Sequence, residues 1–99
     1  MRYATVLVAG PSMLPTLREG DCLLVRRGAP IRPGDVVVGR LRARASLLVV
    51  KRAVRADEGG WLLAADNPAV EGHGLTGGVA DVEARVLLRY WPLPLRRVR

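Results

Sequence analysis

Proline and glycine interrupt this chain so often that only short elements fit between them. The sequence holds 11 glycines and 7 prolines in 99 residues. The apolar runs between them are brief and rich in β-branched residues, which is typical of strands. Candidate strands are residues 3–9, 22–26, 36–38, 46–55, 61–64 and 82–90. Short strands separated by regular turn signals predict an all-β barrel or sandwich.

Two stretches fit this pattern less simply. Residues 66–78 are rich in glycine and polar residues, and we expect a loop there. Residues 82–88 suit a strand, and they also suit a short helical turn. No repeat or linker divides the chain, so residues 1–99 predict a single domain with one core.

The composition points to a soluble, cytoplasmic protein. A spanning helix needs about 20 apolar residues, and neither such a run nor a signal peptide is present, so no transmembrane anchor is expected. The single cysteine, Cys22, excludes an internal disulfide and fits a reducing compartment, where we expect it to be a small core residue. The net charge of +7 reflects either compositional bias or an anionic partner such as an acidic protein, nucleic acid or a membrane surface.

The segment around Ser12 has an unusual proline pattern. Pro11 and Pro15 lack an N–H and restrict φ, so the chain must turn sharply between them. Such a turn exposes the Ser12 hydroxyl and leaves backbone N–H groups unpaired, as an oxyanion hole requires. Taken alone, a serine in a proline-bounded turn is more often an ordinary turn residue.

Lys51 is the only lysine beside fifteen arginines. Arginine stays charged in any protein setting, whereas a buried lysine amine can lose its proton. If residues 46–55 form a strand, Leu47, Val49 and Lys51 share one face, and the apolar neighbours lower the lysine pKa from about 10.4. A shift of about 3 units corresponds to about 4 kcal/mol, which buried lysines reach. We therefore expect Lys51 to be the general base for Ser12. Taken alone, Lys51 would also suit a surface cation on an edge strand. We expect Arg52 to be a solvated or structural residue on the opposite face of the strand.

Four segments resemble the characteristic boxes of the signal peptidase I family, in the same order. Residues 10–21 resemble its nucleophile box, and residues 50–54 resemble its general-base box. Residues 32–38 and 66–68 resemble two further boxes. The resemblance implies a small β-barrel catalytic domain of the signal peptidase and SOS-repressor type, without cofactor or metal. It implies a serine endopeptidase that removes an N-terminal leader or signal peptide from a protein substrate.

Within that family, the chain looks most like the nickel-type superoxide dismutase maturation proteases. These are short, anchor-free and rich in arginine, and they end near Tyr-Trp-Pro, as residues 90–92 read here. The resemblance therefore implies that the client is nickel superoxide dismutase, with cleavage freeing the client's metal-binding amino terminus.

The resemblance also implies roles for individual residues. Ser12 and Lys51 are the catalytic pair, and the Ser12 N–H at the Gly10 turn supports the oxyanion. The remaining implied site residues are Met13 and Leu14 in the substrate cleft, and Asp66 and Asn67 as a brace for the loop around Lys51. The chain departs from the family where Gly10 replaces a common serine and where Ala65 precedes Asp66, without the usual Ser-Asp-Ser-Arg run.

Other functions remain open at this level. A signal peptidase could process exported preproteins at an anionic membrane, where the basic residues 96–99 would add about 1 kcal/mol per cation. The departures from the family pattern also allow a catalytically weak relative. SOS-repressor-like peptidases share the dyad, but residues 15–17 favour the signal peptidase side. Two alternatives are disfavoured: His73 as base, because glycines flank it, and a nucleic-acid-binding barrel, because its aromatic residues are few and scattered.

Overall fold

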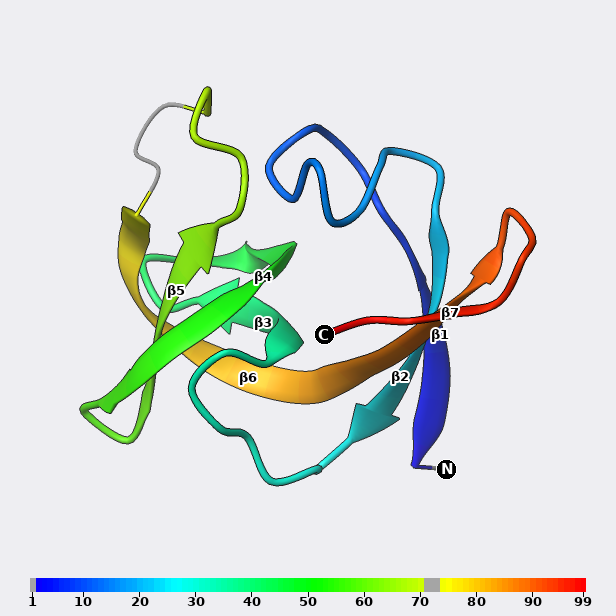
Figure 1. Ribbon diagram of the computed structural model, residues 1–99. Helices are drawn as coiled ribbons and strands as arrows, with labels where there is room; N and C mark the ends of the chain where they lie inside the picture. The colour runs from blue at the N-terminus through cyan, green and yellow to red at the C-terminus, as the bar shows by residue number, and fades with distance from the viewer. Residues whose placement is uncertain (1, 71–73) are drawn as a thin grey trace.

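The structure is a computed structural model that describes residues 2–70 and 74–99, and its regular elements in that part are strands (Figure 1). The all-β prediction is confirmed. The strands are β1 (Tyr3–Leu7), β2 (Cys22–Arg27), β3 (Val36–Leu41), β4 (Arg44–Asp57), β5 (Gly60–Ala65), β6 (Gly74–Trp91) and β7 (Arg96–Arg97). No helix in the described part is long and apolar enough to cross a membrane.

The strands form one antiparallel sheet that closes on part of itself. The order is β1-β2-β6-β3-β4-β5, and β5 also pairs with β6. Strands β3, β4, β5 and β6 therefore make a small closed barrel, whereas β1, β2 and β7 extend from the other end of β6. In Figure 1 the long strand β6 runs beneath both halves and joins them.

Two apolar clusters fill these two halves. The first consists of Val8, Met13, Leu17, Leu23, Val25, Val36, Val38, Ala84 and Val86. The second consists of Val37, Leu41, Ala53, Leu63 and Ala80. Successive side chains of a strand point to opposite faces, so β3 contributes Val36 and Val38 to the first cluster and Val37 to the second. Burial on both faces explains why β3 begins with three consecutive valines.

The structure corrects three details of the sequence prediction. Residues 74–78 belong to β6 and not to a loop, because Gly74 and Leu75 pair with Ala65 and Ala64 of β5. Residues 82–88 are strand, so the helical alternative is wrong. Strand β7 was not predicted, and its two residues have no apolar pattern to indicate it.

Candidate active site

A compact loop between β1 and β2 carries Ser12. The Leu14 N–H donates to the Pro11 carbonyl (3.1 Å), which closes a turn around Ser12 as the prolines predict. The Leu17 N–H donates to the Met13 carbonyl (2.9 Å), and both of these side chains are buried in the first cluster. Two backbone hydrogen bonds close the base of the loop. The Val8 N–H donates to the Asp21 carbonyl, and the Gly20 N–H donates to the Val8 carbonyl (both 2.9 Å). Core packing at the middle of the loop and hydrogen bonds at its base thus hold Ser12 on a rigid support.

Lys51 lies near the middle of β4, in an apolar setting. It is directly opposite Val37 of β3, which is fully buried, and Val49 on the same face packs against the second cluster. Desolvation by burial lowers the pKa of the Lys51 amine from its ordinary value. No carboxylate among the described residues forms an ion pair with it to offset this effect. The local environment therefore shifts the Lys51 pKa in the direction that the sequence predicts.

Ser12 and Lys51 line one cavity, although they are far apart in the sequence. The cavity has a volume of about 280 Å³ and also involves Met13, the end of β1 with the following loop (6–9), and residues 47–50 of β4. Apart from Ser12 and Lys51, every lining residue is apolar. The fold therefore brings a hydroxyl and a partly desolvated amine into a common apolar cleft between β1 and β4. Leu14 does not line this cavity, so the structure gives only Met13 a place in the predicted substrate cleft.

The two predicted oxyanion groups differ in their hydrogen bonding. The Gly10 N–H donates to Glu19 Oε1 (3.1 Å), and Gly10 has a φ of 79°. The Ser12 N–H has no acceptor among the described residues. Of the two groups, only the Ser12 N–H is therefore left without a hydrogen-bond acceptor in the described part of the chain.

Asn67 ties the loop after β5 to the Ser12 loop. Its backbone N–H donates to the Ser12 carbonyl and its Nδ2 donates to the Pro11 carbonyl (both 2.9 Å). Its Oδ1 also accepts the Ala69 N–H (2.9 Å), which orients the amide. Asn67 thus braces the serine directly, whereas the expected role was to brace the loop around Lys51.

Asp66 connects the same loop to β4. Its carboxylate accepts two bonds from Arg52, Nε to Oδ1 (3.1 Å) and Nη2 to Oδ2 (2.5 Å), and one from Thr16 Oγ1 (2.5 Å). Burial by itself raises the pKa of Asp66, but the hydrogen bonds from Arg52 and Thr16, together with the Arg52 charge, outweigh burial and lower it. The ionised carboxylate therefore holds the nucleophile loop and the lysine strand together.

Arg52 has the structural role that the sequence interpretation allowed, with more hydrogen-bond partners than the sequence indicates. Besides Asp66, its Nη1 donates to the Gly34 carbonyl (2.9 Å) and to the Arg99 carbonyl (2.6 Å). Strand alternation correctly placed Arg52 on the face opposite Lys51, but its partners come from three other segments, which no local pattern reveals. Thr16 enters the sequence interpretation only as part of a motif, which does not predict its hydrogen bond to Asp66.

Other candidates contribute less to this site. Cys22 is only partly buried, so it is not the core residue that its apolar neighbours predict. His73 lies outside the described residues. Within residues 2–70 and 74–99, no group of His, Cys, Asp and Glu side chains is arranged to hold a metal ion.

Comparison with known families gives an independent assignment. The profile of the Peptidase S24-like family matches residues 2–87, a range that includes both Ser12 and Lys51. The family lies in the clan of signal peptidases and LexA-like peptidases, and its domain indicates a serine peptidase. The match does not distinguish a subfamily within that clan. A search of curated proteins finds no significant match.

Proposed function

The chain belongs to the Peptidase S24-like family, and from this premise we propose that it is a serine endopeptidase with Ser12 as nucleophile and Lys51 as general base. One observation carries the proposal: Ser12 and the only lysine of the chain, Lys51, line the same apolar cavity, and burial lowers the lysine pKa. A serine hydroxyl needs such a base, because it is a weak nucleophile while it keeps its proton.

The first half of the reaction uses the neutral amine. Lys51 Nζ takes the proton from Ser12 Oγ as that oxygen bonds to the carbonyl carbon of the scissile peptide. The carbonyl electron pair moves onto its oxygen, and the Ser12 N–H donates to this oxyanion. The Lys51 ammonium then gives its proton to the leaving amine as the C–N bond breaks, which leaves an ester on Ser12.

The second half repeats these steps with water. Lys51 removes a proton from a water molecule as the water oxygen attacks the ester carbon. Lys51 then returns a proton to Ser12 Oγ when the ester bond breaks. Because the Gly10 N–H is bonded to Glu19, a second oxyanion donor requires a water molecule or release of that bond. Loss of one donor costs about 10²–10³ in rate, so we expect slow turnover of generic peptides.

We propose that the substrate is the N-terminal leader of a client protein, and that the client is nickel superoxide dismutase. The apolar lining of the cavity suits apolar side chains next to the scissile bond. The resemblance of residues 90–92 to the maturation proteases supports this client, and the lone Cys22 supports action in the cytoplasm.

Signal peptidase activity at a membrane surface is the second candidate. The end of β6 and the turn that follows it expose three large apolar side chains: Trp91 (57%), Leu93 (67%) and Leu95 (64%). The exposed Arg96 and Arg97 follow directly. Exposed apolar residues beside cations favour peripheral contact with an anionic bilayer.

The test is cleavage of the nickel superoxide dismutase precursor by the wild type, Ser12→Ala and Lys51→Arg, read by intact mass. We expect the wild type to remove the leader and both variants to be inert. Lys51→Arg is the matched control, because it keeps the positive charge but cannot lose a proton at working pH.

A signal-peptide substrate presented on anionic vesicles separates the two candidates. If the wild type cuts only that substrate, the dyad stands and the client assignment falls. Variants as active as the wild type would contradict the serine–lysine mechanism, and a wild type inert on both substrates would favour a catalytically weak relative.

A further inference from the structure

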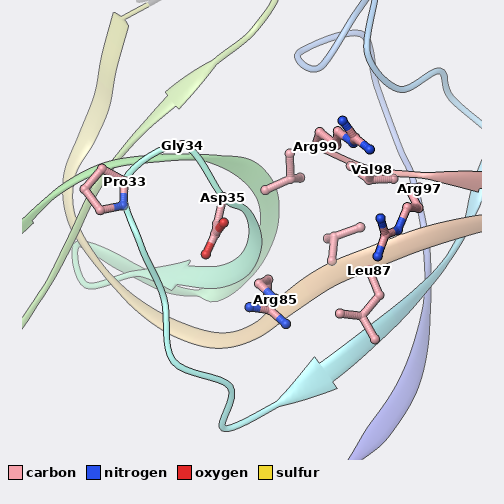
Figure 2. A pocket seen from close by; sticks show the side chains of 10 residues that line it. Pro33, Gly34, Asp35, Arg85, Leu87, Arg97, Val98 and Arg99 are labelled. Atoms are coloured by element: carbon pink, nitrogen blue, oxygen red, sulfur yellow. The ribbon is translucent and has the colours of Figure 1, made fainter.

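Residues 96–99 lie between two depressions that are separate from the Ser12 cavity. The larger has a volume of about 460 Å³, and its lining residues are shown in Figure 2. The smaller has a volume of about 280 Å³. Arg97, Val98 and Arg99 line both, and neither depression shares a residue with the Ser12 cavity. We call this region the arginine groove, after the arginines that line it: Arg85, Arg89, Arg96, Arg97 and Arg99.

The positive charge of the arginine groove has little compensation. Within the described residues only Arg40, Arg42 and Arg52 form ion pairs with carboxylates, so the groove arginines have none. Asp35 carries the only acidic side chain in the lining, and its Oδ2 accepts the Arg32 N–H (2.9 Å). Figure 2 shows the side chains of Asp35 and Arg85 directed toward the same space. The groove is therefore a concave surface with a net positive charge.

The backbone that carries these arginines is well anchored. Strand β7 pairs with β6, and the Val98 N–H donates to the Leu87 carbonyl (3.1 Å). The bond from Arg52 to the Arg99 carbonyl holds the end of the segment. A fixed backbone reduces the ordering entropy that a ligand must offset.

We propose that the arginine groove binds an acidic segment of the client protein in an extended conformation. The proposal rests on the proposed function, since the ligand belongs to the substrate of that peptidase. Guanidinium groups match carboxylates in bidentate geometry, and in the described part β7 pairs only with β6, which leaves its outer edge open to a peptide strand. No aromatic residue lines either depression, which disfavours single-stranded nucleic acid because its bases stack on aromatic rings.

The binding test uses the full chain carrying Ser12→Ala and a fluorescein-labelled octaglutamate peptide, followed by fluorescence anisotropy. The triple variant Arg85→Gln, Arg97→Gln, Arg99→Gln removes three groove charges. We expect it to weaken binding by at least about tenfold, because each charge-assisted hydrogen bond contributes measurably to affinity.

A matched control variant removes the same charge elsewhere, at exposed arginines that do not line the groove: Arg27→Gln, Arg44→Gln and Arg55→Gln. We expect it to change the affinity by less than about twofold, and circular dichroism confirms that both variants fold. Equal weakening by the two variants would overturn the proposal in favour of general charge attraction. Tighter binding of a twelve-residue oligothymidine, with the same dependence on the groove arginines, would replace the acidic peptide by nucleic acid.

The design separates this proposal from the peptidase assignment. Because Ser12→Ala is present throughout, octaglutamate binding does not depend on catalysis. Binding without any cleavage by the wild type would keep the groove as a peptide site and reject the proposed function. Cleavage by the wild type without octaglutamate binding would keep the proposed function and reject the groove as a peptide site.

Discussion

The Ser12 cavity and the arginine groove are both concave, and both depend on neighbouring residues of β4, yet their chemistry is opposite. The cavity is apolar and contains one amine that burial partly desolvates. The groove is polar and carries guanidinium groups without carboxylate partners among the described residues. Lys51 faces the cavity, whereas the adjacent Arg52 binds Asp66 and the Arg99 carbonyl.

This difference matches the roles proposed for the single lysine and for the arginines. A base must be able to release its proton, and only the amine does so at ordinary pH. A cation that pairs with a carboxylate or attracts anions is better as arginine, which stays charged and presents several donors. One strand therefore supplies a neutralisable cation on one face and a permanent cation on the other.

The largest expected effect comes from making the cavity cation resemble the groove cations. Lys51→Arg should lower kcat by about 10²–10⁴, the usual contribution of a general base. Octaglutamate binding should stay unchanged, because Lys51 does not line the groove. Single-turnover cleavage and anisotropy measure the two properties, and retention of cleavage would contradict the assignment of Lys51.

The second-largest expected effect is a difference in pH dependence between cleavage at the Ser12 cavity and octaglutamate binding at the groove. The lowered pKa of Lys51 means that the neutral base becomes populated below the ordinary value of 10.5, so kcat/KM should rise with pH by up to about tenfold per unit until that pKa is reached. Octaglutamate affinity should stay constant between about pH 6 and 9, because arginines and glutamates keep their charges there. A pH-independent kcat/KM would speak against Lys51 as the titrating group.

Arg52→Met breaks the link between the two regions. It leaves the partly buried Asp66 carboxylate without its cation and removes the bond to Arg99, so we expect a loss of about 2 kcal/mol in the free energy of unfolding. Because Asp66 has a lowered pKa, its contribution is present above its ordinary value of 3.8 and disappears as the pH falls through the lower folded value.

Urea unfolding at several pH values measures this effect. The difference between the wild type and Arg52→Met should shrink in acid, and cleavage should slow as the Ser12 loop loses its brace. Asp66→Asn, which keeps the shape of the side chain, is the control. If the difference in free energy of unfolding between the wild type and Arg52→Met stayed constant down to low pH, the stabilisation would not come from the Asp66 carboxylate.

The smallest effect should follow a change on the cavity side alone. Gly10 has a φ of 79°, and no atom lies within 4 Å of the position that an alanine methyl group would occupy, so Gly10→Ala meets backbone strain without a clash. We expect a loss of about 1 kcal/mol, read by urea unfolding, with octaglutamate affinity unchanged. Pro11→Ala has no such strain and is the comparison, and an unchanged stability of Gly10→Ala would contradict the strained turn.

Local patterns in the sequence were sufficient for most of the strands. Prolines and glycines marked the breaks, and β-branched runs marked β2 and β3 to within a few residues. The pattern failed at Gly74 and Leu75, which extend β6, because their strand state depends on pairing with β5 and not on composition. It failed again for β7, whose arginines are held by β6 and by Arg52.

The two reactive groups of the candidate site were also accessible from residue types and motifs. Ser12 stood out by its prolines and Lys51 by being the single lysine, and of the apolar neighbours predicted for Lys51, Val49 packs against the second cluster whereas Leu47 is exposed. The partners of Asp66 and Asn67 were not predictable in this way. Their hydrogen bonds reach Thr16, Pro11 and Ser12, which are fifty or more residues away in sequence, so only the folded chain brings them together.

The sequence by itself determined the strand-rich class, the turn at Ser12 and a cation that can lose its proton. These properties follow from backbone restriction by proline and from the chemistry of an amine, and both act locally. Only the tertiary structure decided that β5 closes the barrel onto β6, that Arg52 joins Asp66 to residue 99, and that five arginines line one groove. Such features arise from strand register and from contacts between distant segments, which no local pattern encodes.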